Sequence, residues 1–252
     1  MKNANLWRAL GRNSIISFIL FACLLGLLWV AEMLIPALQG KLILFGDNAW
    51  VVGIPASIVG VAYILTIKDP SNYTGFYAGI LMSILLGVQF ILLEQYDSAL
   101  LFFCVFIPFQ VKSILNWSKP AKEDAEPFSP EFLNMKAMLI SVLTLLVITI
   151  ADYAYLTWWL EDGLTGNIVP KVLSGLLISS SVLANFWLIY RKTDSWIYWF
   201  IYSAAGIGLF IIFKNPFSIV LFTFFLVING MAGIAWIKNT KPENRGWLKC
   251  SK

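Results

Sequence analysis

The stretch that decides the fold is residues 135–156, which read MKAMLISVLTLLVITIADYAYL and carry a charge only at Lys136 and Asp152. An apolar run of this length crosses a hydrocarbon core of about 30 Å as an α-helix. Polarity does not alternate within Leu139–Leu143, whereas the strands of a membrane β-barrel alternate from residue to residue. The stretch therefore predicts a transmembrane helix.

The rest of the chain repeats this pattern. Residues 14–36 are interpreted as a true span, because the run is too long for a signal peptide and no small-residue cleavage site follows it. The last two spans are separated only by Lys214 and Asn215, and one helix across both would exceed the bilayer about twofold. The eight predicted spans are residues 14–36, 48–67, 76–93, 98–117, 135–156, 168–190, 196–213 and 216–237.

The composition of the 252 residues, 59% hydrophobic and 13% charged, excludes a water-soluble enzyme and a disordered chain, because soluble domains carry about a quarter charged residues. Mean hydropathy is +0.78. The chain has no histidine, and its three cysteines, Cys23, Cys104 and Cys250, have no metal-binding spacing. We expect no catalytic residues, no metal, no cofactor and no nucleic-acid partner. A membrane enzyme would need a cluster of catalytic side chains that the spans lack.

The distribution of lysine and arginine predicts the orientation, because cytoplasmic loops of membrane proteins are enriched in both. With eight spans the two termini share one side, and only Lys41, Lys171 and Lys214 fall on the other. We therefore predict that both termini are cytoplasmic. The fifteen basic residues on that side are Lys2, Arg8, Arg12, Lys68, Lys112, Lys119, Lys122, Lys136, Arg191, Lys192, Lys238, Lys241, Arg245, Lys249 and Lys252.

An internal repeat relates residues 48–117 to residues 168–237. Gln110 precedes Trp117 by seven residues, and Asn229 precedes Trp236 by the same spacing. A three-helix unit crosses the membrane an odd number of times, so the single helix 135–156 between the copies makes them parallel. The predicted fold is an all-α integral membrane protein with this 3+1+3 order. Outside the repeat lie an extra N-terminal helix (1–40), an acidic cytoplasmic linker (118–134) and a basic tail (238–252).

Uncharged polar residues within the spans are the candidate ligands. Gln110 and Asn229 occupy equivalent positions of the two copies, where each amide needs a hydrogen-bond partner. They line a shared cavity in our interpretation; the alternative is a hydrogen bond that only joins helices. Asn185 shares a helix face with Ser174 and Ser181. Two further residues, Gln89 and Ser203, are candidates for the same lining.

Aromatic residues are concentrated at the start of the span 196–213. Trp196 and Trp199 share one helix face with Ser203, so they can point inward and stack on a planar, cationic solute. The alternative is an aromatic belt at the membrane surface, which also accounts for Tyr198 and Tyr202. No ionisable residue lies near the centre of a span, which argues against a proton relay. The candidate solute-binding residues are thus Gln89, Gln110, Asn185, Trp196, Trp199, Tyr202, Ser203 and Asn229.

The second copy resembles the PnuC family of bacterial nicotinamide riboside transporters. The resemblance rests on Leu183–Trp187, Arg191-Lys192, the W-x-x-W motif of Trp196 and Trp199, and Gly233–Trp236. It extends over about residues 48–238. The first copy departs from it, because residues 72–76 lack the tryptophans of the family pattern.

This resemblance implies a fold similar to that of SWEET sugar carriers, a homotrimer, and a place in the bacterial inner membrane. It also implies uptake of nicotinamide riboside, a vitamin B3 and NAD precursor, by facilitated diffusion, with trapping by a cytoplasmic kinase. The alternative of similar architecture is a carrier for another vitamin, such as thiamine or riboflavin, or for a sugar.

Overall fold

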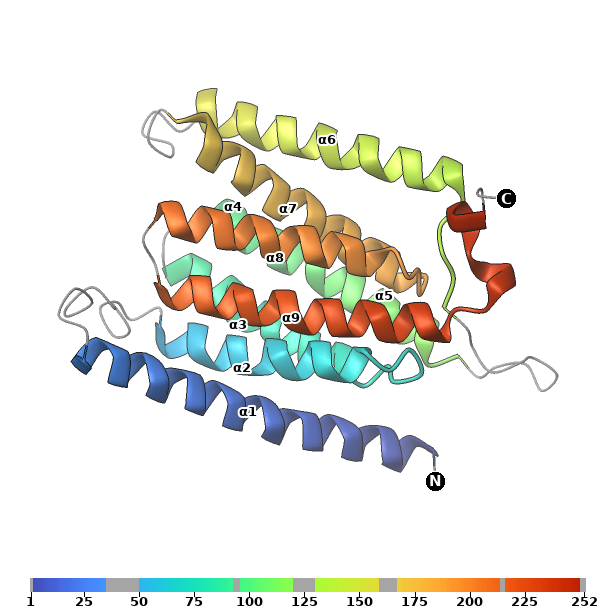
Figure 1. The fold of residues 1–252 in the computed structure, drawn as a ribbon, viewed down its shortest axis with the longest axis horizontal. Coiled ribbons are helices and arrows are strands. Elements are labelled where there is room, and N and C mark those ends of the chain that lie inside the picture. Colours follow the sequence, from blue (N-terminus) through green and yellow to red (C-terminus); the bar gives the residue numbers. More distant parts are fainter. Residues whose placement is uncertain are drawn as a thin grey trace. The chain divides into compact units, whose positions relative to one another are not determined.

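The computed structural model describes residues 2–34, 50–92, 96–119, 130–158, 167–213 and 216–249. The chain divides into two compact units, Met1–Glu126 and Pro127–Lys252, and both are built of helices (Figure 1). The acidic stretch 123–127 and Lys41, Lys122, Lys214 and Lys252 lie outside the described residues.

The described part of the first unit consists of four helices, each packed against the next. α1 (Lys2–Leu34) packs against α2 (Trp50–Ile67), α2 packs against α3 (Gly75–Leu92), and α3 packs against the helix that closes the unit. This last helix consists of α4 (Tyr96–Leu101), a π-helical turn η2 (Phe102–Phe106) and α5 (Ile107–Trp117). We refer to α2, α3 and α4–η2–α5 as the first triplet.

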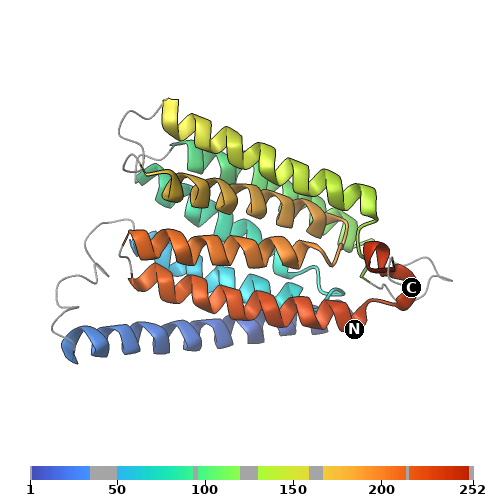
Figure 2. The same ribbon diagram turned by 45° about the horizontal axis from the view of Figure 1, so that its top comes forward.

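The second unit begins with α6 (Met135–Trp158), followed by α7 (Ile168–Ile189), α8 (Ser195–Ile212) and α9 (Pro216–Asn239). Each helix packs against the next one along the chain, and both ribbon views show α8 beside α9 (Figure 2). Two short 3₁₀ turns, η3 (Pro242–Asn244) and η4 (Gly246–Lys249), follow α9. We refer to α7, α8 and α9 as the second triplet.

Hydropathy explains these helices. Within the described residues, six helices are long and apolar enough to cross a membrane. The apolar part of α2, Val52–Ile67, is shorter. The prediction of an all-helical membrane protein is confirmed in this form, whereas the count of eight spans and the 3+1+3 order stay predictions. In the most apolar stretch of α7, 50% of the residues are buried, whereas in that of α6 only 17% are. α7 therefore forms the centre of its unit.

The first helix differs from its predicted extent, because it begins at Lys2 and not at residue 14. Polar side chains of this extension and of the following turns fasten it to the first triplet. Asn13 Nδ2 donates to Thr66 Oγ1 at 3.1 Å, and the buried Ser17 hydroxyl donates to the carbonyl of Ile58. Near the start of the helix, Thr74 Oγ1 donates to the carbonyl of Leu6 at 3.3 Å. The added helix is thus part of the first unit.

The closing helix of the first unit changes its winding just before Pro108. Ile107 N–H donates to the carbonyl of Phe102, five residues back, which is the bond of a π turn. Pro108 has no N–H and leaves the carbonyl four residues before it without its usual helical partner. Beside this turn, a Cβ on Gly87 of α3 would lie only 2.6 Å from the ring of Phe103. Gly87 therefore allows α3 to pack closely against the π turn.

The turn after α7 places a non-glycine residue in left-handed conformation. Arg191 has φ 56°; its N–H donates to Leu188 O, and Lys192 N–H donates to Trp187 O. This is the helix-ending motif in which glycine normally occupies the left-handed position. Burial also lowers the pKa of the Arg191 guanidinium to about 10.

We expect Arg191→Gly to unfold at higher denaturant concentration than Arg191→Ala. Both substitutions remove the same side chain, but only alanine bears the cost of about 1–2 kcal/mol for a Cβ in left-handed conformation. Denaturant unfolding of the two purified variants in detergent measures the difference. An alanine variant as stable as the glycine variant would contradict the left-handed geometry at this residue.

Candidate functional site

One face of α8 carries the aromatic and hydroxyl side chains that the sequence singled out. Trp196, Trp199 and Ser203 are spaced so that they share this face, and their exposed fractions are 3%, 7% and 0%. They are therefore buried within the second unit. An aromatic belt residue would instead present its ring at the surface.

Asn229 of α9 connects to this face of α8. Its Nδ2 donates to the carbonyl of Trp199 at 3.2 Å and to Ser203 Oγ at 3.0 Å. Ser203 Oγ in turn donates to the same carbonyl at 2.9 Å. The Asn229 amide thus joins α8 to α9 through both hydrogen bonds of its Nδ2. Such a bond between helices is the alternative role that the sequence left open for this residue.

Three polar atoms of this cluster have no hydrogen-bond partner in the described part of the chain. They are Asn229 Oδ1 and the indole Nε1 atoms of Trp196 and Trp199, and all three are buried. A buried polar atom left without a partner costs about 1–3 kcal/mol, and native proteins contain few of them. The cluster thus contains one acceptor and two donors without partners among the described residues.

Aromatic rings surround these atoms. The rings of Trp199 and Tyr202 meet edge to face, with centroids 5.4 Å apart, and Tyr202 also contacts Phe222 at 5.3 Å. Trp196 meets Trp236 of α9 at 5.6 Å. A Cβ on Gly233 would lie 3.2 Å from Trp196 Cβ, so a small residue there allows this close approach. The cluster combines flat apolar surfaces with a few polar atoms, as small-molecule sites do.

The first triplet contains a related but different cluster. Gln110 is 1% exposed, and its Nε2 donates to Tyr63 Oη of α2 at 3.3 Å. A Cβ on Gly79 of α3 would lie 2.8 Å from the Gln110 amide carbon, so this glycine makes room for the amide. Gln89 of α3 lies against Gly53 of α2 in the same way.

The two triplets have similar residues at two positions of their second helices, the second and the ninth. Phe76 and Trp196 each occupy the second position of their helix, and each meets the tryptophan of the third helix edge to face. The Phe76–Trp117 centroids are 4.7 Å apart. Ser83 and Ser203 both occupy the ninth position, and both are fully buried. The two triplets share these packing pairs, while the repeat as a whole stays a prediction.

Two residues of these clusters escaped the sequence interpretation. Ser83 Oγ is buried and has no hydrogen-bond partner within the described residues, and Tyr63 is the partner of Gln110. Tyr63 matches Asn185, since each lies four residues before the end of the first helix of its triplet. Asn185 is 3% exposed and donates to Ser181 O of its own helix. Aligning the triplets on their helix ends would have identified both residues.

The structure thus brings together Trp199, Tyr202, Ser203 and Asn229, with Trp196 one turn away on α8. Gln110 and Gln89 belong to the other unit and have their own neighbours there. Among the described residues, no three His, Cys, Asp or Glu side chains are close enough to one another to bind a metal ion.

Comparison with known proteins agrees with this architecture. The sequence profile of the nicotinamide mononucleotide transporter family matches residues 50–238. The crystal structure of the vitamin B3 transporter PnuC is similar in fold, with a TM-score of 0.60 and 18% sequence identity. The alignment covers 91% of this chain and 96% of that protein. No curated protein matches the sequence significantly. The chain therefore belongs to the nicotinamide mononucleotide transporter family, and it is a membrane transporter and not an enzyme.

Proposed function

We propose that this protein takes up nicotinamide riboside by facilitated diffusion. The observation that supports this most directly is the cluster of buried aromatic rings, with Asn229 Oδ1 and the Trp199 Nε1 left without partners among the described residues. Nicotinamide riboside offers a flat pyridinium ring, a carboxamide and ribose hydroxyls, so it can supply both the surface and the hydrogen bonds.

The charge of the solute fits the same cluster. Residues 195–212 and 216–237, which form α8 and nearly all of α9, contain no Asp, Glu, Lys or Arg. Aromatic faces attract cations without a fixed anion, so Trp196, Trp199 and Tyr202 can bind the pyridinium ring. A phosphorylated solute would need a cationic partner, which these segments lack. We therefore favour the riboside over the mononucleotide that gives the family its name.

The transport mechanism in this proposal is uniport. The solute is held in the second triplet by Trp196, Trp199, Tyr202, Ser203 and Asn229, and the further candidate ligands are Gln89, Gln110 and Asn185. The spans provide no carboxylate near their centres for a proton relay, so movement is downhill. Phosphorylation by a cytoplasmic kinase traps the product, and the working assembly is a homotrimer.

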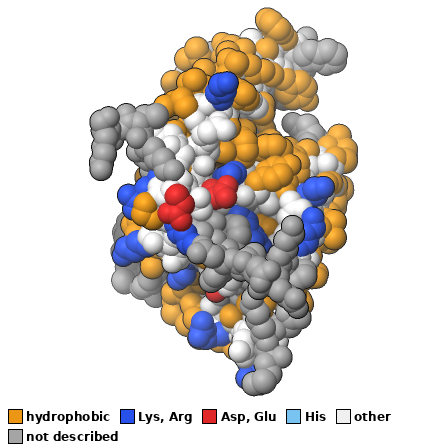
Figure 3. Space-filling model, turned by 90° about the vertical axis from the view of Figure 1, so that its right-hand side faces the viewer, with side chains coloured by type: hydrophobic (Ala, Val, Ile, Leu, Met, Phe, Trp, Pro, Cys, Tyr) orange, Lys and Arg blue, Asp and Glu red, His pale blue; other side chains and the backbone are white. Residues whose placement is uncertain are grey.

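Orientation in the membrane is part of the same proposal. We place the protein in the bacterial inner membrane with both termini in the cytoplasm, because basic residues favour that side. Figure 3 looks onto one end of the helices and shows lysine and arginine side chains on this face, together with acidic and hydrophobic side chains.

Liposomes that contain the purified protein are expected to take up labelled nicotinamide riboside without any ion gradient, because the spans offer no carboxylate near their centres for a proton relay. Uptake should stop when the internal and external concentrations are equal. Empty liposomes provide the control. A strict requirement for a proton or sodium gradient would refute the uniport mechanism and leave the choice of substrate open.

Competition distinguishes the alternative solutes in the same assay. An excess of unlabelled riboside should block uptake, whereas the mononucleotide, thiamine, riboflavin and glucose should not. Inhibition by the mononucleotide alone would assign the phosphorylated solute in place of the riboside. Inhibition by thiamine, riboflavin or glucose alone would assign a different vitamin or a sugar.

A further inference from the structure

The turn between α7 and α8 binds two other segments of the second unit through a buried carboxylate. Asp194 is 0% exposed. Its Oδ2 accepts from the backbone N–H of Leu133 at 2.7 Å, and its Oδ1 accepts from the indole Nε1 of Trp247 at 2.6 Å. Leu133 belongs to the segment that leads into α6, and Trp247 belongs to η4, after the end of α9.

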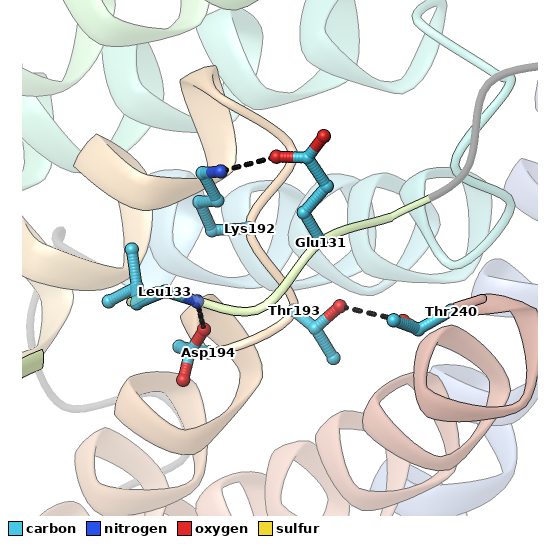
Figure 4. A network of polar contacts seen from close by, with 6 residues as sticks. All are labelled: Glu131, Leu133, Lys192, Thr193, Asp194 and Thr240. Atoms are coloured by element: carbon cyan, nitrogen blue, oxygen red, sulfur yellow. Dashed lines mark hydrogen bonds and ion pairs between the residues drawn. The ribbon is translucent and has the colours of Figure 1, made fainter. Parts of the chain in front are cut away.

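Further bonds join the same three segments (Figure 4). The Lys192 ammonium pairs with the Glu131 carboxylate at 2.6 Å, and Thr193 N–H donates to Glu131 O at 2.8 Å. The hydroxyls of Thr193 and Thr240 share a hydrogen bond of 3.1 Å. We call the joined segments, 130–134, 190–194 and 240–249, the clasp.

The C-terminal part of the clasp is held in one register. Phe132 N–H donates to Asn244 O at 2.8 Å, and Trp247 N–H donates to Leu133 O at 2.9 Å. Gly246 between them has φ +48°, and a Cβ there would lie 2.1 Å from Leu133 O. Only glycine therefore allows the chain to approach so closely, and the approach sets Trp247 against Asp194.

Burial makes the Asp194 carboxylate depend on its hydrogen-bond donors. Burial raises the pKa of the Asp194 carboxyl, and the N–H donors of Leu133 and Trp247 act in the opposite direction, as does the charge of Lys192. A desolvated carboxylate relies on such donors. Loss of one donor therefore weakens the whole junction.

The clasp continues directly into α8. Asp194 is the residue before Ser195, where the helix begins, and its carbonyl accepts from Ile197 N–H at 3.0 Å. Trp196 N–H donates to Thr193 O at 3.2 Å. The first turn of α8 is thus built on clasp residues, and Trp196 and Trp199 lie in its first two turns.

The first unit has an equivalent brace. Thr74 is the residue directly before α3, as Asp194 is before α8. Its hydroxyl donates to Leu6 O of α1, and Asn72 Nδ2 approaches the same carbonyl at 3.5 Å. In each triplet, the turn before the second helix is therefore bound by a segment from outside the triplet. This segment is the start of α1 in the first unit and the C-terminal tail in the second.

We propose that Asp194 is a positioning residue, which fastens the C-terminal tail to the α7–α8 turn and so holds Trp196 and Trp199 in the orientation that binds solute. The clasp itself is argued from the contacts of the second unit. The effect on solute binding rests on the proposed function.

Trp247→Phe tests the proposal, because it keeps a ring beside Phe132, 6.2 Å away in the native protein, and removes only the indole donor to Asp194. Hydrogen exchange of the Leu133 amide and of the first turns of α8 should become about tenfold faster or more, as expected for a lost hydrogen bond to a charged group. Trp158→Phe is the matched control, because Trp158 is 78% exposed. Equal exchange in the two variants would overturn the clasp.

Uptake by the same variants tests the positioning role. Trp247→Phe should raise the riboside concentration needed for half-maximal uptake and leave the maximal rate unchanged, which marks a loss of binding alone. Gly246→Ala, which displaces the tail by another route, should do the same. Faster exchange with unaltered half-saturation would overturn positioning and keep the clasp. Exchange needs no solute, so its result stands even where the native protein fails to transport the riboside.

Discussion

Asn229→Leu is expected to weaken riboside binding by about tenfold or more, and the free energy of unfolding should fall as well. Leucine has the branching of asparagine but is larger, and it removes both the Oδ1 acceptor that the solute would use and the Nδ2 donor to Ser203. A lost buried hydrogen bond costs about 1 kcal/mol, more where a partner is left unpaired, and 1.4 kcal/mol is tenfold in affinity. Equilibrium binding of labelled riboside to detergent-purified protein measures this loss.

The stability of the same variant separates a binding role from a structural one. Leucine cannot replace the two hydrogen bonds from Asn229 Nδ2 to Trp199 O and Ser203 Oγ, so the solute-free variant should lose about 1–3 kcal/mol of stability. A residue that only joined α8 to α9 would show this lower stability with unchanged riboside binding by the folded protein.

Thr223→Val provides the control on the same helix. Thr223 is exposed, and its hydroxyl donates to Ile219 O of its own helix. This substitution removes a polar group at nearly constant volume, and both binding and stability should stay as in the native protein. Riboside affinity that is equal in Asn229→Leu and Thr223→Val would remove Asn229 from the site.

Gly175→Ala should lower the free energy of unfolding by about 1–3 kcal/mol, the usual cost of overpacking. A Cβ at this position of α7 would lie 2.7 Å from the backbone carbonyl oxygen of Thr149 in α6 and 3.0 Å from its Cα. Backbone atoms cannot move aside by changing a rotamer, so the two helices must separate. The bond of 3.0 Å between Thr149 and Ser179 hydroxyls would then be lost as well.

Gly230→Ala is the matched control for this substitution. A Cβ at Gly230 of α9 would meet nothing within 4 Å, so only the gain in helix propensity remains, up to about 1 kcal/mol. Unfolding of both variants in the same detergent gives the comparison. Two variants of equal stability would show that α6 and α7 are not packed closely at Gly175.

Hydropathy predicts the helices of this protein closely, since a bilayer requires about 20 apolar residues for each crossing. It cannot predict the first twelve residues of α1, because their polarity gives no membrane signal. Their helical structure depends on tertiary bonds such as that between Asn13 and Thr66. The π turn is likewise not evident in the largely apolar run 98–117, where Pro108 is the only helix-breaking residue.

Residues of the candidate site could be predicted from the sequence where a polar residue interrupts an apolar helix face. Asn229 and Ser203 were identified in this way, and Trp199 by its helical spacing from Ser203. Tyr63 was missed because a tyrosine in an apolar run is indistinguishable from a core residue. Asp194 was missed because an acidic residue in a loop is usually solvated, and only the fold brings Leu133 and Trp247 to its carboxylate.

The π turn in the first triplet also accounts for a difference in length between the third helices of the two triplets. Tyr96 and Pro216 begin corresponding helices, yet Trp117 is one residue further from Tyr96 than Trp236 is from Pro216. A π turn accommodates one extra residue within an α-helix, and an extra residue wound as α-helix would rotate everything after it by about 100°. The wider turn therefore accommodates the additional residue, and Gln110 keeps the same spacing from Trp117 that Asn229 has from Trp236.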